Sequence, residues 1–277
     1  MRVFISADIE GISGVVAGDQ TGPKGYDYGR ARKLMTGEVN AAVEGALAAG
    51  AAEVVVNDAH GSMRNILIEE LIPEARLMTG SPKILGMMEG IDHPAGFDVC
   101  GFVGYHARAG TQGVLNHTIS GGVVSRVHLN GREVGETGLN AALAGHHGVP
   151  LAFLSGDSDV CRQVQELVPG VVTVAVKEAV GRYAALCMSP EKAREAIRDG
   201  MMSAVSKARE GDLSPLSVEA PVRISLVVSD TAMADLAAML PGSHREGFLE
   251  VAYEAQDARS AFVALRAMIM LASCSRR

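Results

Sequence analysis

Cysteine is scarce in this chain, and its few copies are isolated from one another. The four cysteines, at positions 100, 161, 187 and 274, form no C-x-x-C pair. Closely spaced cysteines would be needed for a disulfide framework or for a zinc site built from thiolates, so neither is expected. We expect isolated buried thiols instead, which favours a cytoplasmic location.

Long apolar runs and basic runs are missing as well. No uncharged apolar stretch reaches the ~18 residues of a membrane-spanning helix, and the longest candidate, residues 261–273, is interrupted by Arg266. The apolar run at the N-terminus stops at Asp8 without a small-residue cleavage pattern, so no signal peptide is expected. The longest basic run has two residues and the net charge is −7. We therefore expect neither a membrane nor nucleic acid as a partner.

The remaining composition is that of a globular protein with a substantial core. Of the 277 residues, 48% are hydrophobic and 21% are charged, which fits one large domain or two modest ones. The pattern predicts a strand over residues 2–7, a helix over 28–49 and an unalternating β-branched strand over 53–57. Strand, helix and buried strand in this order form the unit of a parallel sheet. The predicted fold class is α/β, a mostly parallel sheet flanked by helices.

The last third of the chain has a different residue pattern. Ser189 followed by Pro190 is a favourable helix start, and a linker rich in Gly, Ser and Pro covers residues 211–221. A β-α-β-α pattern with few clustered catalytic residue types follows. These observations predict an α/β metal-binding catalytic domain over residues 1–188 and a smaller C-terminal α+β domain over residues 189–277, which we interpret as a packing or oligomer-forming unit.

Two carboxylates follow the first predicted strand. Asp8 and Glu10 are separated by one residue, so in extended backbone their side chains point the same way. Two like charges on one face repel each other unless a cation or a donor lies between them. Read alone, the pair could equally be a cap or part of a salt bridge, but it is also a plausible half of a metal site.

Other potential ligands follow later elements. His60 comes after the second strand, His106 after a strand over residues 97–103, His117 in the next connection, and Glu136 at the start of a helix. Neighbouring parallel strands share one carboxyl edge, so these side chains can converge. Imidazoles and carboxylates without thiolates suit Zn²⁺ and also Mn²⁺, Co²⁺ or Fe²⁺, and five ligands with a bridging carboxylate suit two metals. Glu136 alone could be a first-turn acid favoured by the helix dipole.

Five ordered blocks carry a specific resemblance. They are residues 6–14 (SADIEGISG), 56–60 (VNDAH), 104–108 (GYHAR), 116–118 (NHT) and 130–136 (NGREVGE). In order and spacing the chain resembles the D-aminopeptidase family of dizinc peptidases, peptidase family M55. One D-x-E-G occurs by chance, whereas five blocks in order are far more specific.

The resemblance implies a role for each candidate residue. Asp8 matches the carboxylate that bridges two zinc ions, Glu10 and His60 match the other ligands of one zinc, and His106 and Glu136 match those of the second. His117 matches an active-site histidine that is not a ligand and assists catalysis. Members of the family assemble as ring-shaped decamers, so a homo-oligomer is implied.

The implied activity is zinc-dependent removal of N-terminal residues, D-amino acids in particular, from short peptides. Two zinc ions sharing a water would lower its pKa, and His117 could donate a proton to the leaving amine or stabilise the oxyanion. Two alternatives stay open: a two-metal phosphoesterase or amidohydrolase using the same cluster, and a non-catalytic metal-binding or assembly protein. No motif encodes the preference for D-residues.

Overall fold

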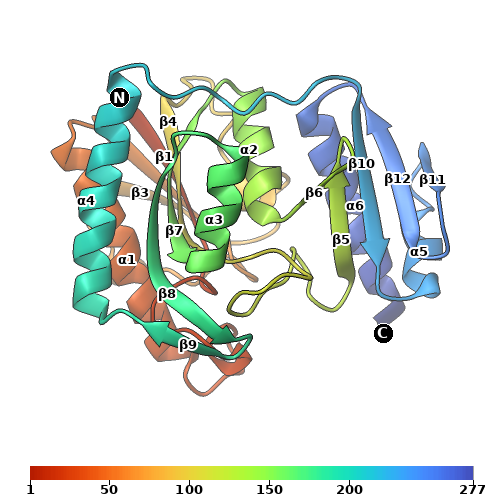
Figure 1. Cartoon of the computed structure of the whole chain (residues 1–277), viewed down its shortest axis with the longest axis horizontal. Helices are drawn as coiled ribbons and strands as arrows, with labels where there is room; N and C mark the ends of the chain where they lie inside the picture. Colours follow the sequence, from red (N-terminus) through yellow and green to blue (C-terminus); the bar gives the residue numbers. More distant parts are fainter. Residues whose placement is uncertain (277) are drawn as a thin grey trace.

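The computed structural model describes residues 1–276 and contains two β-sheets with helices between and around them (Figure 1). Sheet A has the strand order β3-β2-β1-β4-β7-β8-β9. Its strands are β1 (Arg2–Ala7), β2 (Glu53–Asp58), β3 (Ala75–Met78), β4 (Val99–Tyr105), β7 (Leu151–Asp157), β8 (Val172–Gly181) and β9 (Ala184–Cys187). All neighbours in sheet A are parallel except β8 and β9, which form an antiparallel hairpin. The predicted α/β fold class is confirmed.

Sheet B is antiparallel and has the order β11-β12-β10-β5-β6. Its strands are β5 (Val124–Leu129), β6 (Arg132–Val134), β10 (Val222–Val228), β11 (Ser243–Arg245) and β12 (Glu250–Ala255). A tight hairpin turn joins β5 to β6, where Asn130 and Gly131 both have positive φ, 47° and 80°. Such a turn matches the right-handed twist of the two strands it connects.

Helices cover both faces of sheet A (Figure 1). The helices are α1 (Tyr28–Ala48), α2 (Glu136–His146), α3 (Ser158–Leu167), α4 (Pro190–Arg209), α5 (Thr231–Ala237) and α6 (Ala258–Ser273), with short 3-10 turns η1 (Gly18–Gln20), η2 (Ile68–Glu70), η3 (Gly86–Met88) and η4 (Cys274–Arg276). Helices α1 and α4 pack on each other over one face, and α2 and α3 lie between sheet A and sheet B. No helix within residues 1–276 is long and apolar enough to cross a membrane.

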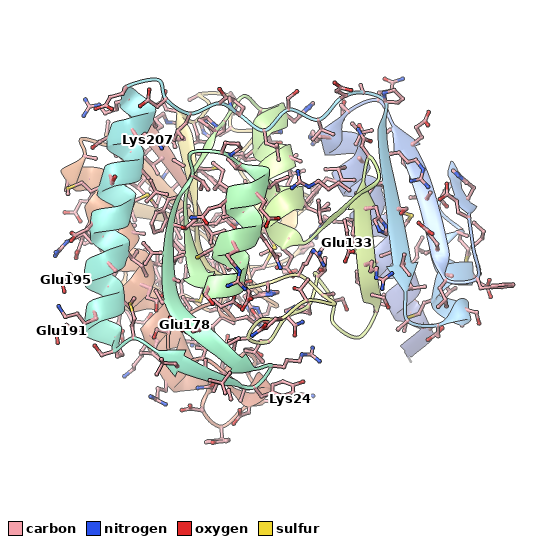
Figure 2. The ribbon with its side chains drawn as sticks, in the orientation of Figure 1. Lys24, Glu133, Glu178, Glu191, Glu195 and Lys207 are labelled. Atoms are coloured by element: carbon pink, nitrogen blue, oxygen red, sulfur yellow. The ribbon has the colours of Figure 1, made fainter. Side chains whose placement is uncertain are left out.

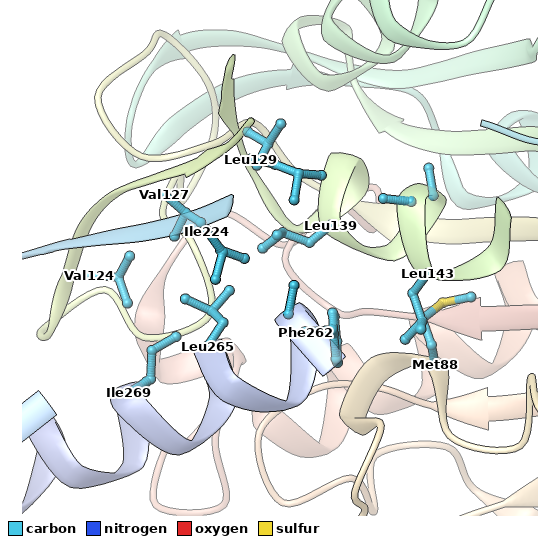
Figure 3. Packing of buried hydrophobic residues seen from close by; sticks show 14 of the residues in the cluster. Met88, Val124, Val127, Leu129, Leu139, Leu143, Ile224, Phe262, Leu265 and Ile269 are labelled. Carbon is cyan, nitrogen blue, oxygen red and sulfur yellow. The ribbon is translucent and has the colours of Figure 1, made fainter. Parts of the chain in front are cut away.

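The alternation of β1 divides the hydrophobic core in two. Val3, Ile5 and Ala7 belong to the cluster beneath α1 and α4, whereas Phe4 belongs to the cluster shared with sheet B. In the cluster shared with sheet B, apolar side chains of α2, α6, β5 and β10 pack against one another, with α2 on one side and α6 on the other (Figure 3). Both faces of β1 are therefore buried, as its continuous apolar sequence requires.

Helix α4 shows how the sequence pattern becomes structure. The Ser189 side chain accepts a hydrogen bond from the Lys192 amide, and Pro190 is the first helical residue. Glu191 and Glu195, one turn apart, extend from α4 away from sheet A (Figure 2). A polar outer face and an apolar inner face are typical of a helix that covers a sheet.

Elements before and after the predicted domain boundary at residue 188 contact each other. Helix α4, which follows the boundary, packs on α1, and the earlier strand β5 pairs with β10. The division into residues 1–188 and 189–277 stays a prediction.

Candidate metal centre

The predicted site residues meet at the carboxyl edge of sheet A. Strand β1 lies between β2 and β4, and its last residue, Ala7, is paired with Asp58 on one side and Val103 on the other. Asp8, His60 and His106 follow these strand ends and so face one another across the same edge. The convergence predicted from the sequence is confirmed.

A close backbone approach holds the loop after β1 in this position. The Gly11 amide donates to the carbonyl oxygen of Gly104 over 2.7 Å. A Cβ atom on residue 11 would lie 1.9 Å from the carbonyl oxygen of Tyr105, so only glycine fits beside the end of β4. The glycine that follows the two acids thus lets their loop rest on the neighbouring strand.

Asp8, Glu10 and His60 form the first group of potential ligands. The Nδ1 atom of His60 lies 3.2 Å from Asp8 Oδ1 and 2.7 Å from Glu10 Oε2. Both acids are buried, with 2% and 5% of their surface exposed. One atom from each residue can be chosen so that all three lie within 4.8 Å of one another, a spacing that a single cation could draw together.

His106, His117 and Glu136 form the second group, again within 4.8 Å. Glu136 Oε2 lies 3.5 Å from His106 Nε2, and Glu136 Oε1 lies 3.8 Å from His117 Nε2. His117 is thus only 0.3 Å farther from the carboxylate than His106 is. Its role as a non-ligand, implied by the resemblance, stays a prediction.

Asp8 lies between the two groups and faces each with a different oxygen. Its Oδ1 faces His60, and its Oδ2 lies 3.6 Å from His106 Nε2. A carboxylate in this position can bridge two cations.

Backbone carbonyls fix the orientation of all three imidazoles. His60 Nε2 contacts the Thr21 carbonyl oxygen at 2.7 Å, while His106 Nδ1 and His117 Nδ1 contact the carbonyl oxygens of Ala107 and Leu115, each at 2.9 Å. A carbonyl oxygen only accepts, so in each case the ring nitrogen donates. The other nitrogen of each neutral ring is left with its lone pair facing the carboxylates, as in metal-ligating histidines.

Unpartnered atoms in the site fit a cation. Asp8 Oδ2 and His106 Nε2 are buried, and neither has a hydrogen-bond partner among residues 1–276. Buried polar atoms without partners are costly. An electron-poor ion between them would satisfy both, and the mixed imidazole and carboxylate donors suit zinc.

Without a cation, protons are redistributed among these groups. Burial and the charge of Glu10 raise the pKa of Asp8 to about 7. Burial alone would lower the pKa of His106, but Glu136, Asp8 and Glu10 together outweigh burial and raise that pKa to about 10. The pKa of His60 is likewise raised well above its ordinary value, against the effect of burial, by Glu10 and Asp8. In the metal-free site, protonation of His60 and His106 is therefore favoured.

Two buried lysines that the sequence did not reveal brace the loops of the site. Lys177 on β8 donates to the carbonyl oxygens of Glu10, Ile12 and Val15. Lys83 donates to Asn57 Oδ1 and to the carbonyl oxygens of Asp58 and Met78. Each lysine gathers several acceptors around one ammonium group, and no local motif marks either of them.

Asp58 supports the loop after β2. Its carboxylate accepts bonds from the amides of Asn65 and Ile66 and from the Asn65 side chain, which also donates to the His60 carbonyl oxygen. Asp58 therefore fixes the backbone that carries His60 and does not contact the imidazole ring by a hydrogen bond.

Both groups, except for the buried His106, line one cavity of about 280 Å³. Asp8, Glu10, His60, His117 and Glu136 line one part of it, and the other part is apolar except for Ser81 and Arg266. His60 and His117 keep 15% and 19% of their side-chain surface exposed. The potential ligands are thus accessible to a small molecule.

Comparisons with known proteins agree with this geometry. The family model described as peptidase M55, D-aminopeptidase, matches residues 1–267. The D-aminopeptidase of Bacillus subtilis (strain 168) is 36% identical over 273 residues, which are 98% of each chain. A solved structure, described as the Zn-dependent D-aminopeptidase DppA from Bacillus subtilis, a self-compartmentalizing protease, is similar with a TM-score of 0.94 and 35% identity, over 99% of this chain and 98% of that one.

Proposed function

This chain belongs to the M55 family of D-aminopeptidases, and from that membership we propose that it uses two zinc ions to remove the N-terminal residue, a D-amino acid, from short peptides. The observation that carries the proposal is the position of Asp8. Its two oxygens face two separate ligand groups, His60 on one side and His106 on the other. One carboxylate shared by two groups is the arrangement that a pair of metal ions requires.

The proposed ligands follow from this arrangement. Asp8 would bridge the two ions, Glu10 and His60 would complete one site, and His106 and Glu136 would complete the other. The unpartnered Asp8 Oδ2 and His106 Nε2 support this assignment. Bound zinc supplies a Lewis acid and lowers the pKa of water.

His117 is proposed to carry the proton of the reaction. Its Nδ1 is held by the Leu115 carbonyl oxygen, and its Nε2 lies at the cavity, 4.0 Å from Glu10 Oε1. A free ring nitrogen beside the acids can take up a proton and deliver it to the amine that leaves. The apolar wall of the cavity would exclude bulk water from this exchange.

The alternative function, a two-metal phosphoesterase, gains no cation from Arg108, the last residue of the third block. Arg108 forms an ion pair with Glu133 at 2.8 Å and does not line the cavity of the two groups. It is engaged elsewhere.

Metal analysis combined with a substrate panel tests the proposal. We expect two zinc ions per chain, turnover of D-alanyl dipeptides in preference to their L-counterparts, and loss of turnover on chelation that zinc restores. Turnover of p-nitrophenyl phosphate without turnover of any dipeptide would contradict the proposal. One zinc ion per chain would contradict the bridging role of Asp8.

We further propose that the chain acts as a homo-oligomer, a decamer by the family resemblance, in the cytoplasm. The hairpin of β8 and β9 supports an assembly, because Val180, Tyr183 and Leu186 there are 76%, 61% and 69% exposed. Apolar groups that gather on a surface are typical of interfaces. Light scattering coupled to size exclusion should give about ten chains per particle, and a monomer would contradict the proposal.

A further inference from the structure

Arg266 places a cation in the cavity that holds the two ligand groups. It lies on α6, in the last third of the chain, yet it lines the cavity together with Asp8, Glu10 and Glu136. Its guanidinium occupies the space beside Gly86 of η3, where a Cβ atom would lie 2.1 Å from Arg266 Nη1. The absence of a side chain at residue 86 is therefore what lets the arginine reach this position.

The guanidinium has few partners of its own. Its Nη2 donates to the Lys83 carbonyl oxygen over 3.0 Å, and within residues 1–276 no carboxylate lies within the 4.0 Å of an ion pair with it. The acid that influences it, Glu89, already accepts a hydrogen bond from the Leu85 amide at 2.7 Å. A guanidinium carries five N–H donors, so most of them stay available.

Most other partly buried arginines contact a carboxylate, and Arg32, which does not, donates to two backbone carbonyl oxygens. Arg2 contacts Glu53 at 2.7 Å and Arg108 contacts Glu133 at 2.8 Å. Arg266 is partly buried without such a partner, and burial lowers its pKa from the ordinary value. Desolvating a cation without a counter-charge is costly, which points to an anion that is supplied by a ligand.

We propose that Arg266 binds the free α-carboxylate of the peptide substrate and so makes the site selective for short peptides with an open C-terminus. The inference rests on the proposed function, because the same peptide would place its N-terminal residue at the ligand groups and its C-terminal carboxylate at Arg266. The planar guanidinium matches a carboxylate and can bind it through two parallel hydrogen bonds.

The size and lining of the cavity agree with a short substrate. Its volume of about 280 Å³ is at the lower end of the ~300–1,000 Å³ that is common for ligand pockets. Ile269 and Met270, three and four residues after Arg266 on α6, line the same cavity. Residues at this spacing share one helix face, so α6 offers a charged group next to an apolar wall for a small side chain.

The experiment compares D-alanyl-D-alanine with its C-terminal amide, which keeps the scissile bond and removes the charge. For the zinc-loaded wild type we expect kcat/KM to be at least about tenfold higher for the free acid, as for a charge-assisted hydrogen bond. Arg266→Met should abolish that preference by raising KM for the acid, with amide turnover unchanged. Arg259→Met, on the same helix but in contact with Asp92 outside the cavity, should keep the preference.

The outcomes separate this inference from the proposed function. Equal rates for acid and amide in the wild type, or equal losses on both in Arg266→Met, would overturn the role of Arg266 while leaving the peptidase intact. A wild type inactive on both compounds would contradict the proposed function itself and remove the basis of this inference. If circular dichroism shows that Arg266→Met is unfolded, Arg266→Gln, which can still donate to the Lys83 carbonyl oxygen, takes its place with the same expected loss of preference.

Discussion

The imidazole rings of His106 and His117 are stacked, with centroids 4.3 Å apart and planes inclined by 10°. Each ring donates through Nδ1 to a backbone carbonyl oxygen, of Ala107 and Leu115 respectively. Their Nε2 atoms therefore both face Glu136, at 3.5 Å and 3.8 Å. Geometry alone allows two ligands here or one ligand beside one proton carrier, and the two arrangements give different results on mutation.

Replacing His117 by alanine should reduce turnover and leave the zinc content at two ions per chain. A positioned proton carrier contributes about 10²–10⁴ in rate, so we expect kcat to fall by that factor. Inductively coupled plasma mass spectrometry and dipeptide kinetics measure the two effects. Glu136→Ala should lose one zinc ion, and His93→Ala, at an exposed histidine, should change neither quantity. A loss of zinc from His117→Ala would make His117 a ligand.

Zinc binding to the metal-free protein should release protons. Since the pKa of His106 is raised to about 10 and that of His60 is also raised, both rings are protonated at neutral pH and must lose a proton to become ligands. Apparent zinc affinity should consequently rise as the pH increases toward 10. Calorimetry in buffers of different ionisation enthalpy measures the released protons. His106→Ala should release fewer protons on binding zinc. A binding enthalpy that does not depend on the buffer would contradict the protonation of these histidines in the metal-free protein.

The proposed ligands could be predicted from the sequence because each of them follows a strand or opens a helix. Asp8, His60 and His106 are all next to strand ends of a parallel sheet, whose common edge brings them together whatever their separation in sequence. Arg266 and Lys177 gave no such signal. They reach the site through packing of α6 on η3 and of β8 on the β1 loop, and long-range packing of single side chains leaves no periodic pattern.

Glu38 should make the stability of the protein depend on pH. Its Oε1 accepts a bond from the Ser13 amide at 2.8 Å, and burial raises its pKa to about 7 from an ordinary value of 4.5. Between these values the folded state binds more protons than the unfolded state, so the free energy of unfolding falls as the pH rises through this window. The loss is on the order of 3 kcal/mol above pH 7.

Glu38→Gln removes the titration and keeps an acceptor for Ser13. The measurement is urea unfolding at fixed protein concentration and in excess chelator. The free energy of unfolding of the variant should rise relative to that of the wild type from pH 5 to pH 8. Glu44→Gln, on the same helix at an exposed position, serves as the control. A difference between the Glu38 variant and the wild type that is the same at both pH values would contradict the raised pKa.

Lys177→Met should weaken zinc binding, although Lys177 contacts only the backbone of a proposed ligand and not its side chain. The ammonium group of Lys177 donates to three carbonyl oxygens in the loop that carries Glu10. Its removal takes the donor from the carbonyl oxygens of Glu10 and Val15, whereas that of Ile12 keeps the Val15 amide, and a buried acceptor left without a donor is costly. Loss of a group that orients a metal ligand typically lowers metal affinity by about 10–100-fold. Competition with a fluorescent zinc chelator measures this loss.

The matched control is Lys207→Met. Lys207 lies near the end of α4 (Figure 2), and its ammonium group donates to the Gly170 carbonyl oxygen at the surface. We expect this variant to bind zinc as the wild type does. A Lys177→Met protein that is folded and keeps full zinc affinity would show that the other contacts of the Glu10 loop, such as those of Gly11 with β4 and of Ser13 with Glu38, are enough to hold its shape. Lys177 would then matter only for stability.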